Sequence, residues 1–113
     1  MAGNKRFLEG KKITVPVAAG EVSGNPIAVG QITGVALIDR TPAGNVTLDR
    51  EGVYSLNVSA TAAPVTVGMP IYWAANANPD LRLSEVAAGG ILFGYSLAAI
   101  AQGQAAVVDV VLK

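Results

Sequence analysis

The sequence predicts an all-β fold, a small barrel or sandwich of short antiparallel strands with an extended N-terminal arm. Short runs of β-branched and aromatic residues recur at intervals of roughly 8–12 residues, which is typical of such folds. Gly, Pro, Asn and Asp residues separate the runs, and no heptad repeat or amphipathic helix interrupts them. The length of 113 residues fits one domain. We therefore divide the chain into a basic arm, residues 1–12, and a single β domain, residues 13–113.

The first strand is expected over residues 12–18, KITVPVA, where apolar and more polar positions alternate. Pro16 lies inside this run and has no backbone N–H to donate, so the strand should lie at the edge of a sheet. PIAVGQI and TGVALID follow as two more strands. Gly30 and Gly34 within them indicate a bulge or a sharp bend.

The central part of the chain predicts two hairpins. VTLD and VYSLNVSA are expected to pair across a turn at residues 50–52, with Tyr54, Leu56 and Val58 on one face. MPIYWA and LRLS then flank the turn cluster NANPD, because Asn, Pro and Asp each favour turns. The alternation in LRLS places Leu81 and Leu83 on one face and Arg82 on the other.

Two apolar strands are predicted near the C-terminus, ILFGYSLAAIA and AVVDVVLK. In each strand, alternate residues should share a face. The first strand places on one face Ile91, Phe93, Tyr95 and Leu97. The second strand places on one face Val108, Val110 and Leu112. Its other face carries Val107, Asp109 and Val111.

The composition indicates association with other chains. Hydrophobic residues make up 51% of the chain and charged residues 14%, against a usual charged share of about 25%. A small domain has too little interior for so much apolar surface. An ordinary domain rich in Ala and Val is one explanation. We favour an oligomer or a docked subunit, with aromatic interface candidates Tyr72, Trp73, Phe93 and Tyr95.

The basic arm is the second candidate contact region. Residues 1–12 carry a net charge of +3, and the remaining residues carry −3. Arms of this kind often bind another surface, although a solvated terminus is common in any protein. The apolar pair Phe7 and Leu8 favours docking. The predicted contacts are Lys5, Arg6, Phe7, Leu8, Lys11 and Lys12.

No catalytic, cofactor-binding or metal-binding residue is predicted, and we do not expect an enzyme. The sequence has no Cys and no His, which excludes disulfides, thiol nucleophiles and zinc-finger sites. Asp49 and Glu51 flank a turn and are expected in solvent. Asp39 is followed by Arg40 and Thr41, whereas a retroviral-type protease needs Asp-Thr/Ser-Gly.

Nucleic acids and membranes are not expected partners. Aromatic residues make up only 5% of the chain and the body is acidic, unlike a nucleic-acid groove. The most apolar run, residues 86–101, is short for a membrane span and is broken by glycines. The polar start does not resemble a secretory signal, so we expect a soluble protein.

Four stretches carry a family resemblance: VSGNPIAVGQITGVAL, REGVYSLNV, VGMPIYWAANANPDLRLS and GGILFGYSLAAIAQGQAAVVDVVLK. Together they resemble the small head decoration (cement) proteins of tailed bacteriophages, in a branch known as a domain of unknown function. The resemblance covers most of residues 11–113 and leaves out residues 1–10.

This resemblance implies a compact β domain on the outer surface of the virion head, often a trimer at threefold or quasi-threefold positions. Such a protein clamps neighbouring major capsid subunits, has no enzymatic activity and is made in the host cytoplasm before assembly. The arm would then lie on the capsid shell. The alternatives are a sugar- or surface-binding module, such as the base of a head fibre using Trp73, and a small hydrolase with paired carboxylates.

Overall fold

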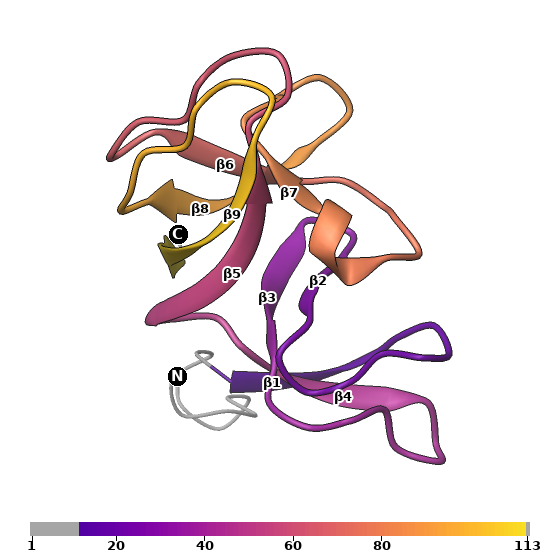
Figure 1. Cartoon of the computed structure of the whole chain (residues 1–113). Helices are drawn as coiled ribbons and strands as arrows, with labels where there is room; N and C mark the ends of the chain where they lie inside the picture. Colours follow the sequence, from indigo (N-terminus) through magenta and orange to yellow (C-terminus); the bar gives the residue numbers. More distant parts are fainter. Residues whose placement is uncertain (1–11, 113) are drawn as a thin grey trace.

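The computed structural model describes residues 12–112. In this part of the chain a four-stranded sheet lies beside a closed five-stranded barrel (Figure 1). The all-β prediction is confirmed, and the chain combines a barrel with an open sheet. The predicted arm lies outside the described residues except for Lys12, which begins the first strand.

The four-stranded sheet is antiparallel and has the order β1-β4-β3-β2. Its strands are β1 (Lys12–Pro16), β2 (Pro26–Val29), β3 (Ile32–Ala36) and β4 (Asn45–Asp49). Among residues 12–112, β1 pairs only with β4, which confirms the edge position predicted from Pro16. Within this part of the chain the sheet thus has two free edges, one on β1 and one on β2.

Two glycines shape this sheet, and only Gly30 forms the sharp bend that the sequence predicts, since the register of β2 with β3 is regular through Gly34. Gly30 opens the two-residue turn between β2 and β3 with a φ of 60°, a conformation that side chains disfavour. Gly34 lies within β3, where an added Cβ would approach the Asp49 carbonyl oxygen to 2.7 Å. The absence of a side chain at Gly34 therefore lets β4 pack closely on β3.

The predicted hairpin between β4 and β5 (Val53–Ser59) is wrong. β4 is already paired on both sides, with β1 and with β3, so no edge remains for β5. The chain instead passes through residues 50–52 into the barrel, with Gly52 at a φ of 113°. The predicted shared face of Tyr54, Leu56 and Val58 is confirmed, since all three contribute to the barrel core.

The barrel has the order β5-β7-β6-β8-β9 and closes through the pairing of β9 with β5. It comprises, besides β5, the strands β6 (Pro70–Trp73), β7 (Leu83–Ser84), β8 (Ile91–Ser96) and β9 (Ala105–Leu112). Its pairs are antiparallel except that β5 and β7 run parallel.

The β6–β7 hairpin is confirmed, but the faces predicted at its turn are wrong. Residues 79–81 form one turn of 3-10 helix, η1 (Pro79–Leu81), capped by the side chain of Asn78. This turn changes the alternation, so Leu81 is 55% exposed and Arg82 is only 6% exposed. Leu83 is fully buried. The hairpin therefore directs a charged side chain inward.

β8 contains a bulge that the alternation did not predict. The register with β6 shifts between Ile71 and Tyr72, and Phe93 is the extra residue in β8. Phe93 is consequently buried in the core, whereas Tyr95 is 37% exposed on the outside of the barrel. The prediction that these two aromatics share a face is wrong for this reason.

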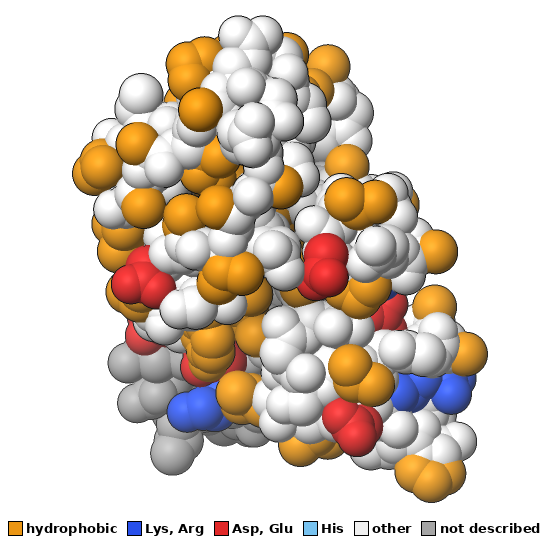
Figure 2. Space-filling view, in the orientation of Figure 1, with side chains coloured by type: hydrophobic (Ala, Val, Ile, Leu, Met, Phe, Trp, Pro, Cys, Tyr) orange, Lys and Arg blue, Asp and Glu red, His pale blue; other side chains and the backbone are white. Residues whose placement is uncertain are grey.

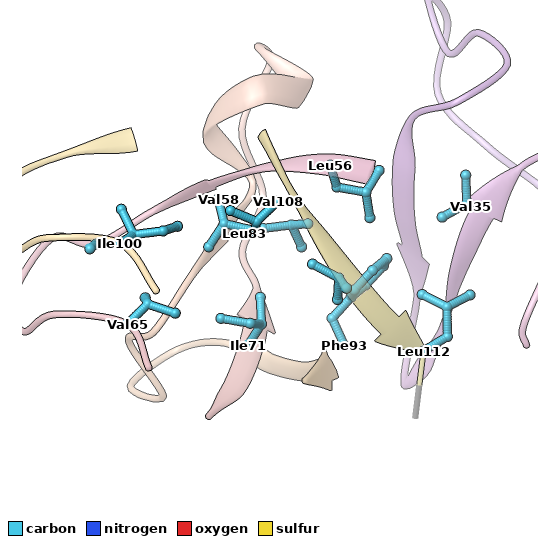
Figure 3. Packing of buried hydrophobic residues seen from close by; sticks show 12 residues of the cluster. Val35, Leu56, Val58, Val65, Ile71, Leu83, Phe93, Ile100, Val108 and Leu112 are labelled. Atoms are coloured by element: carbon cyan, nitrogen blue, oxygen red, sulfur yellow. The ribbon is translucent and has the colours of Figure 1, made fainter. Parts of the chain in front are cut away.

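The core consists of two clusters of buried side chains. The larger fills the barrel and includes Val35 from β3, which brings the sheet against the barrel (Figure 3). The smaller lies on the sheet. β9 contributes Val108, Val110 and Leu112 to the barrel core, and their predicted common face is confirmed. The larger cluster comprises Val35, Leu56, Val58, Ala60, Val65, Ile71, Leu83, Phe93, Ile100, Val108, Val110 and Leu112.

Substituting Gly94 by alanine should destabilise the protein by about 2–3 kcal/mol, because the new methyl group overlaps the carbonyl oxygen of Val111. β8 and β9 would have to separate where they pair in the barrel wall. Urea unfolding measures the loss. Gly68→Ala is the control, since it has a φ of 83° but open space around the added atom. Equal losses in the two variants would contradict the steric explanation.

Candidate functional site

A cleft of about 850 Å³ opens between the sheet and the barrel. The sheet side contributes residues 16–21, which begin at the last residue of β1, and residues 27–29 of β2. The barrel contributes residues 75–77 of the β6–β7 connection, together with Trp73 and Arg82. The lining is mostly small and apolar, with one acidic and one basic side chain.

Arg82 connects the two halves of the molecule beside this cleft. Its Nη1 and Nη2 atoms donate to Oε1 and Oε2 of Glu21 at 2.9 and 2.8 Å, a bidentate ion pair. Its Nε donates to the carbonyl of Asn76 at 2.9 Å, and Nη1 also donates to the carbonyl of Pro26 at 3.1 Å. The side chain is thus held by the barrel's own loop and by the start of β2.

Glu21 is held as a carboxylate. The hydrogen bonds from Arg82 lower the pKa of Glu21 below its usual value, with a further contribution from the Asn25 amide at 2.9 Å, while burial acts in the opposite direction. A carboxyl group with a lowered pKa is ionised at neutral pH and has no proton to give. The pair Glu21–Arg82 is therefore suited to structure rather than to acid catalysis.

Trp73, an interface candidate from the sequence, lies half-buried at the cleft. Its Nε1 donates to the carbonyl of Pro26 at 3.0 Å, so the ring is tied to β2. The Cζ atom of Arg82 lies 6.0 Å from the ring centroid, within the range of a cation–π contact. Tyr72, the neighbouring candidate, is also half-buried.

Tyr95 lies in an apolar row that crosses the outside of the barrel. Val53 pairs with Val111, Val111 pairs with Tyr95, and Tyr95 pairs with Pro70, so four strands contribute to what we call the outer row. Val53 is 53% exposed, and Val107 on the same face of β9 is 62% exposed. Figure 2 shows hydrophobic side chains over the barrel half of the molecule.

The remaining predicted contact residues are placed differently. Phe93 is 1% exposed in the barrel core, so its side chain is not available to another chain. Lys12 is exposed at the start of β1, opposite Asp49 in the pairing register. The other arm candidates lie outside the described residues: Lys5, Arg6, Phe7, Leu8 and Lys11.

A second buried carboxylate, Glu85, also has a structural position. It accepts hydrogen bonds from the backbone N–H and the hydroxyl of Thr61 and from the N–H of Ala62. Within residues 12–112, no group of three acidic side chains is arranged to hold a metal ion. The same residues include no helix of the length and apolarity that a bilayer span requires.

Tyr54 should ionise with a pKa of about 12, because its hydroxyl donates to Asp49 and its phenolate would face that carboxylate. The hydrogen bond from the neutral Tyr54 hydroxyl to Asp49 therefore stabilises the fold, and its contribution is complete below the unfolded-state tyrosine pKa of about 10. It is lost as the pH rises from about 10 to 12. The pKa is checked by subtracting the absorbance titration curve of Tyr54→Phe from that of the wild type. A midpoint of the difference curve near 10 would contradict the contact with Asp49.

A family model described as phage cement protein matches residues 7–112. The match includes the four stretches singled out in the sequence, except for the final residue, Lys113. The match begins at residue 7, so it includes Phe7 and Leu8. The resemblance described from the sequence had left these two residues out. No curated protein and no solved structure matches the chain significantly.

Proposed function

The chain belongs to the phage cement protein family, and from this premise we propose that it binds the outside of a phage head and stabilises contacts between major capsid subunits. The family match over residues 7–112 is the observation that carries the proposal. Cement proteins are structural, and we propose no enzymatic activity, cofactor or nucleic-acid partner. The chain would occupy the outer capsid surface of the virion after a stage in the host cytoplasm.

The contacts are proposed on two parts of the molecule. The outer row around Tyr95 would join copies in a trimer, since it is apolar and continuous across four strands, with Val53 and Tyr95 exposed. The basic arm, including Lys12, would lie on the shell. A trimer presents three linked binding sites to the capsid lattice. The trimer therefore binds much more tightly than a single site would.

The test uses heads that lack this protein. Purified protein should co-sediment with them and raise the temperature at which they rupture. Tyr95→Lys should convert the free trimer to monomer and weaken head binding at least about tenfold by loss of linked sites. Leu81→Lys is the matched control, because Leu81 is exposed on η1 and lies outside the outer row. Absence of head binding at every salt concentration would exclude the proposal.

A sugar- or surface-binding module, such as the base of a head fibre, is the second candidate, favoured by the position of Trp73 at the cleft. Quenching of Trp73 fluorescence distinguishes the two. Protection from quenching by soluble sugars would support the alternative, whereas protection only on binding to heads supports the cement function.

A further inference from the structure

The two free edges of the four-stranded sheet differ in a way that points to a partner. An exposed strand edge can pair with another chain, and proteins commonly block it with Lys or Pro. The β1 edge carries both, exposed Lys12 and Pro16. β2 also begins with a proline, Pro26, but it has no charged residue, and its next three residues, from Ile27 to Val29, line the cleft. Beyond Pro26, the edge of β2 is the one left open to pairing.

The register shows which backbone groups this edge presents. The Ala36 N–H donates to the Asn25 carbonyl at 3.0 Å, which marks a hydrogen-bonded position of the β2–β3 ladder. Such positions alternate along antiparallel strands, so Ile27 and Val29 bond to β3. Ala28 lies between them, and its N–H and C=O therefore point away from β3.

Pro26 shows where these outward groups point. Its carbonyl lies on the same free edge and accepts hydrogen bonds from Trp73 and Arg82 on the barrel side. Ala28 follows two residues later, about 7 Å along the strand, and it lines the cleft. Neither its N–H nor its C=O has a hydrogen-bond partner among residues 12–112. One donor and one acceptor thus face the cleft together.

The walls of the cleft define the chemistry of an occupant. Ala18, Ala75 and Ala77 line it, and such small side chains allow a backbone to approach closely. Its two charged side chains, Glu21 and Arg82, neutralise each other through their ion pair. An uncharged segment complements this lining, whereas a charged one would be desolvated without a partner.

We propose that the free edge of β2 takes up an extended, uncharged segment of the major capsid subunit, which lies in the cleft and adds as a strand beside β2. Main-chain hydrogen bonds to Ala28 fix its register, and the small side chains of the cleft select small apolar residues. The inference rests on the proposed function, which supplies the capsid subunit as the source of the segment.

Proline substitution tests the edge directly. Ala28→Pro removes the outward N–H without breaking a bond of the β2–β3 ladder. Thr14→Pro is the matched control on the β1 edge. The Val17 N–H donates to the Gly44 carbonyl, which by alternation places the Thr14 N–H on the free side of β1. Binding to heads that lack this protein should weaken about tenfold for Ala28→Pro and stay within twofold for Thr14→Pro.

A charge placed in the cleft gives a second test that does not alter a strand. Ala18→Lys introduces an ammonium group at the exposed lining residue 18, and it should weaken head binding about tenfold. Ala43→Lys adds the same charge at an exposed loop position outside the cleft lining and should bind as wild type. Thermal unfolding of all four variants separates loss of binding from loss of folding.

Hydrogen exchange of the Ala28 amide identifies the occupant. Its exchange should slow when wild-type protein binds heads, and remain fast in the free protein. If wild type binds heads while this exchange is unchanged and Ala18→Lys binds normally, the inference is wrong and the proposed function stands. If wild type does not bind heads, both fail. Protection that grows with protein concentration assigns the edge to a second copy, and protection by soluble sugars assigns it to a carbohydrate; either result overturns the inference.

Discussion

Replacing Arg82 by alanine is expected to lower the free energy of unfolding by about 3–5 kcal/mol, the usual cost of breaking a buried ion pair on one side. Arg82 is only 6% exposed, and its guanidinium makes four hydrogen bonds that join the barrel to the segments around β2. Its loss leaves the Glu21 carboxylate without its main partner and the Pro26 carbonyl with Trp73 alone. Chemical denaturation measures the change.

Two controls separate the ion pair from the loss of a charge. Arg40→Ala removes an exposed arginine whose Nε donates to the Val17 carbonyl at 3.1 Å, and it should cost far less. Glu21→Gln combined with Arg82→Met should recover part of the loss, because no unpaired charge remains. A loss no larger for Arg82→Ala than for Arg40→Ala would contradict the role given to the pair.

The same pair predicts an acid dependence of stability. The folded pKa of Glu21 lies below its ordinary value of 4.5, so the contribution of the ionised pair is complete above about pH 4.5 and is lost as the pH falls through the folded value. Arg82→Ala should remove most of this dependence. Stability curves of the two proteins between pH 6 and 3, obtained by denaturation, make the comparison.

Replacing Phe93 by alanine is expected to cost about 3–5 kcal/mol, the range for a large aromatic removed from a packed core. Phe93 is the largest fully buried side chain of the described part, and it is surrounded by barrel residues (Figure 3). The barrel is closed, which limits how far its strands can collapse into the cavity. Thermal and denaturant unfolding measure the loss.

Tyr95→Ala is the matched control for this substitution. Tyr95 lies two residues away on the same strand, but it faces outward. In the monomeric protein its removal should cost about 1 kcal/mol or less, as is usual for surface positions. Similar losses for the two aromatics would contradict the bulge that separates their faces.

The features that depend on neighbouring residues could be predicted from the sequence. Pro16 placed β1 at an edge because a missing N–H has the same consequence in any sheet. The alternation in β9 predicted which of its residues share a face, since successive residues of a regular strand point to opposite sides. The turn-forming run after Trp73 likewise predicted the β6–β7 hairpin.

The features that depend on residues far apart in the chain could not be predicted from the sequence. Glu21 and Arg82 are 61 residues apart, and nothing near either residue announces the other. The alternation even places Arg82 on the face opposite Leu83, whereas the helical turn at 79–81 directs both side chains inward. The separation of β4 from β5 follows from β1 occupying one side of β4, and the bulge at Phe93 follows from the pairing of β8 with β6. Local patterns do not contain these pairings.

The order of the strands also sets when each half can form during translation. All pairings of the four-stranded sheet lie within residues 12–49, so it can assemble early from a nascent chain. The barrel needs Val53 to pair with Val111, and it stays open until that last strand has been synthesised. Until then the apolar face of β5 lacks its partner, and the unfinished polypeptide offers a binding surface to chaperones and to other unfinished chains.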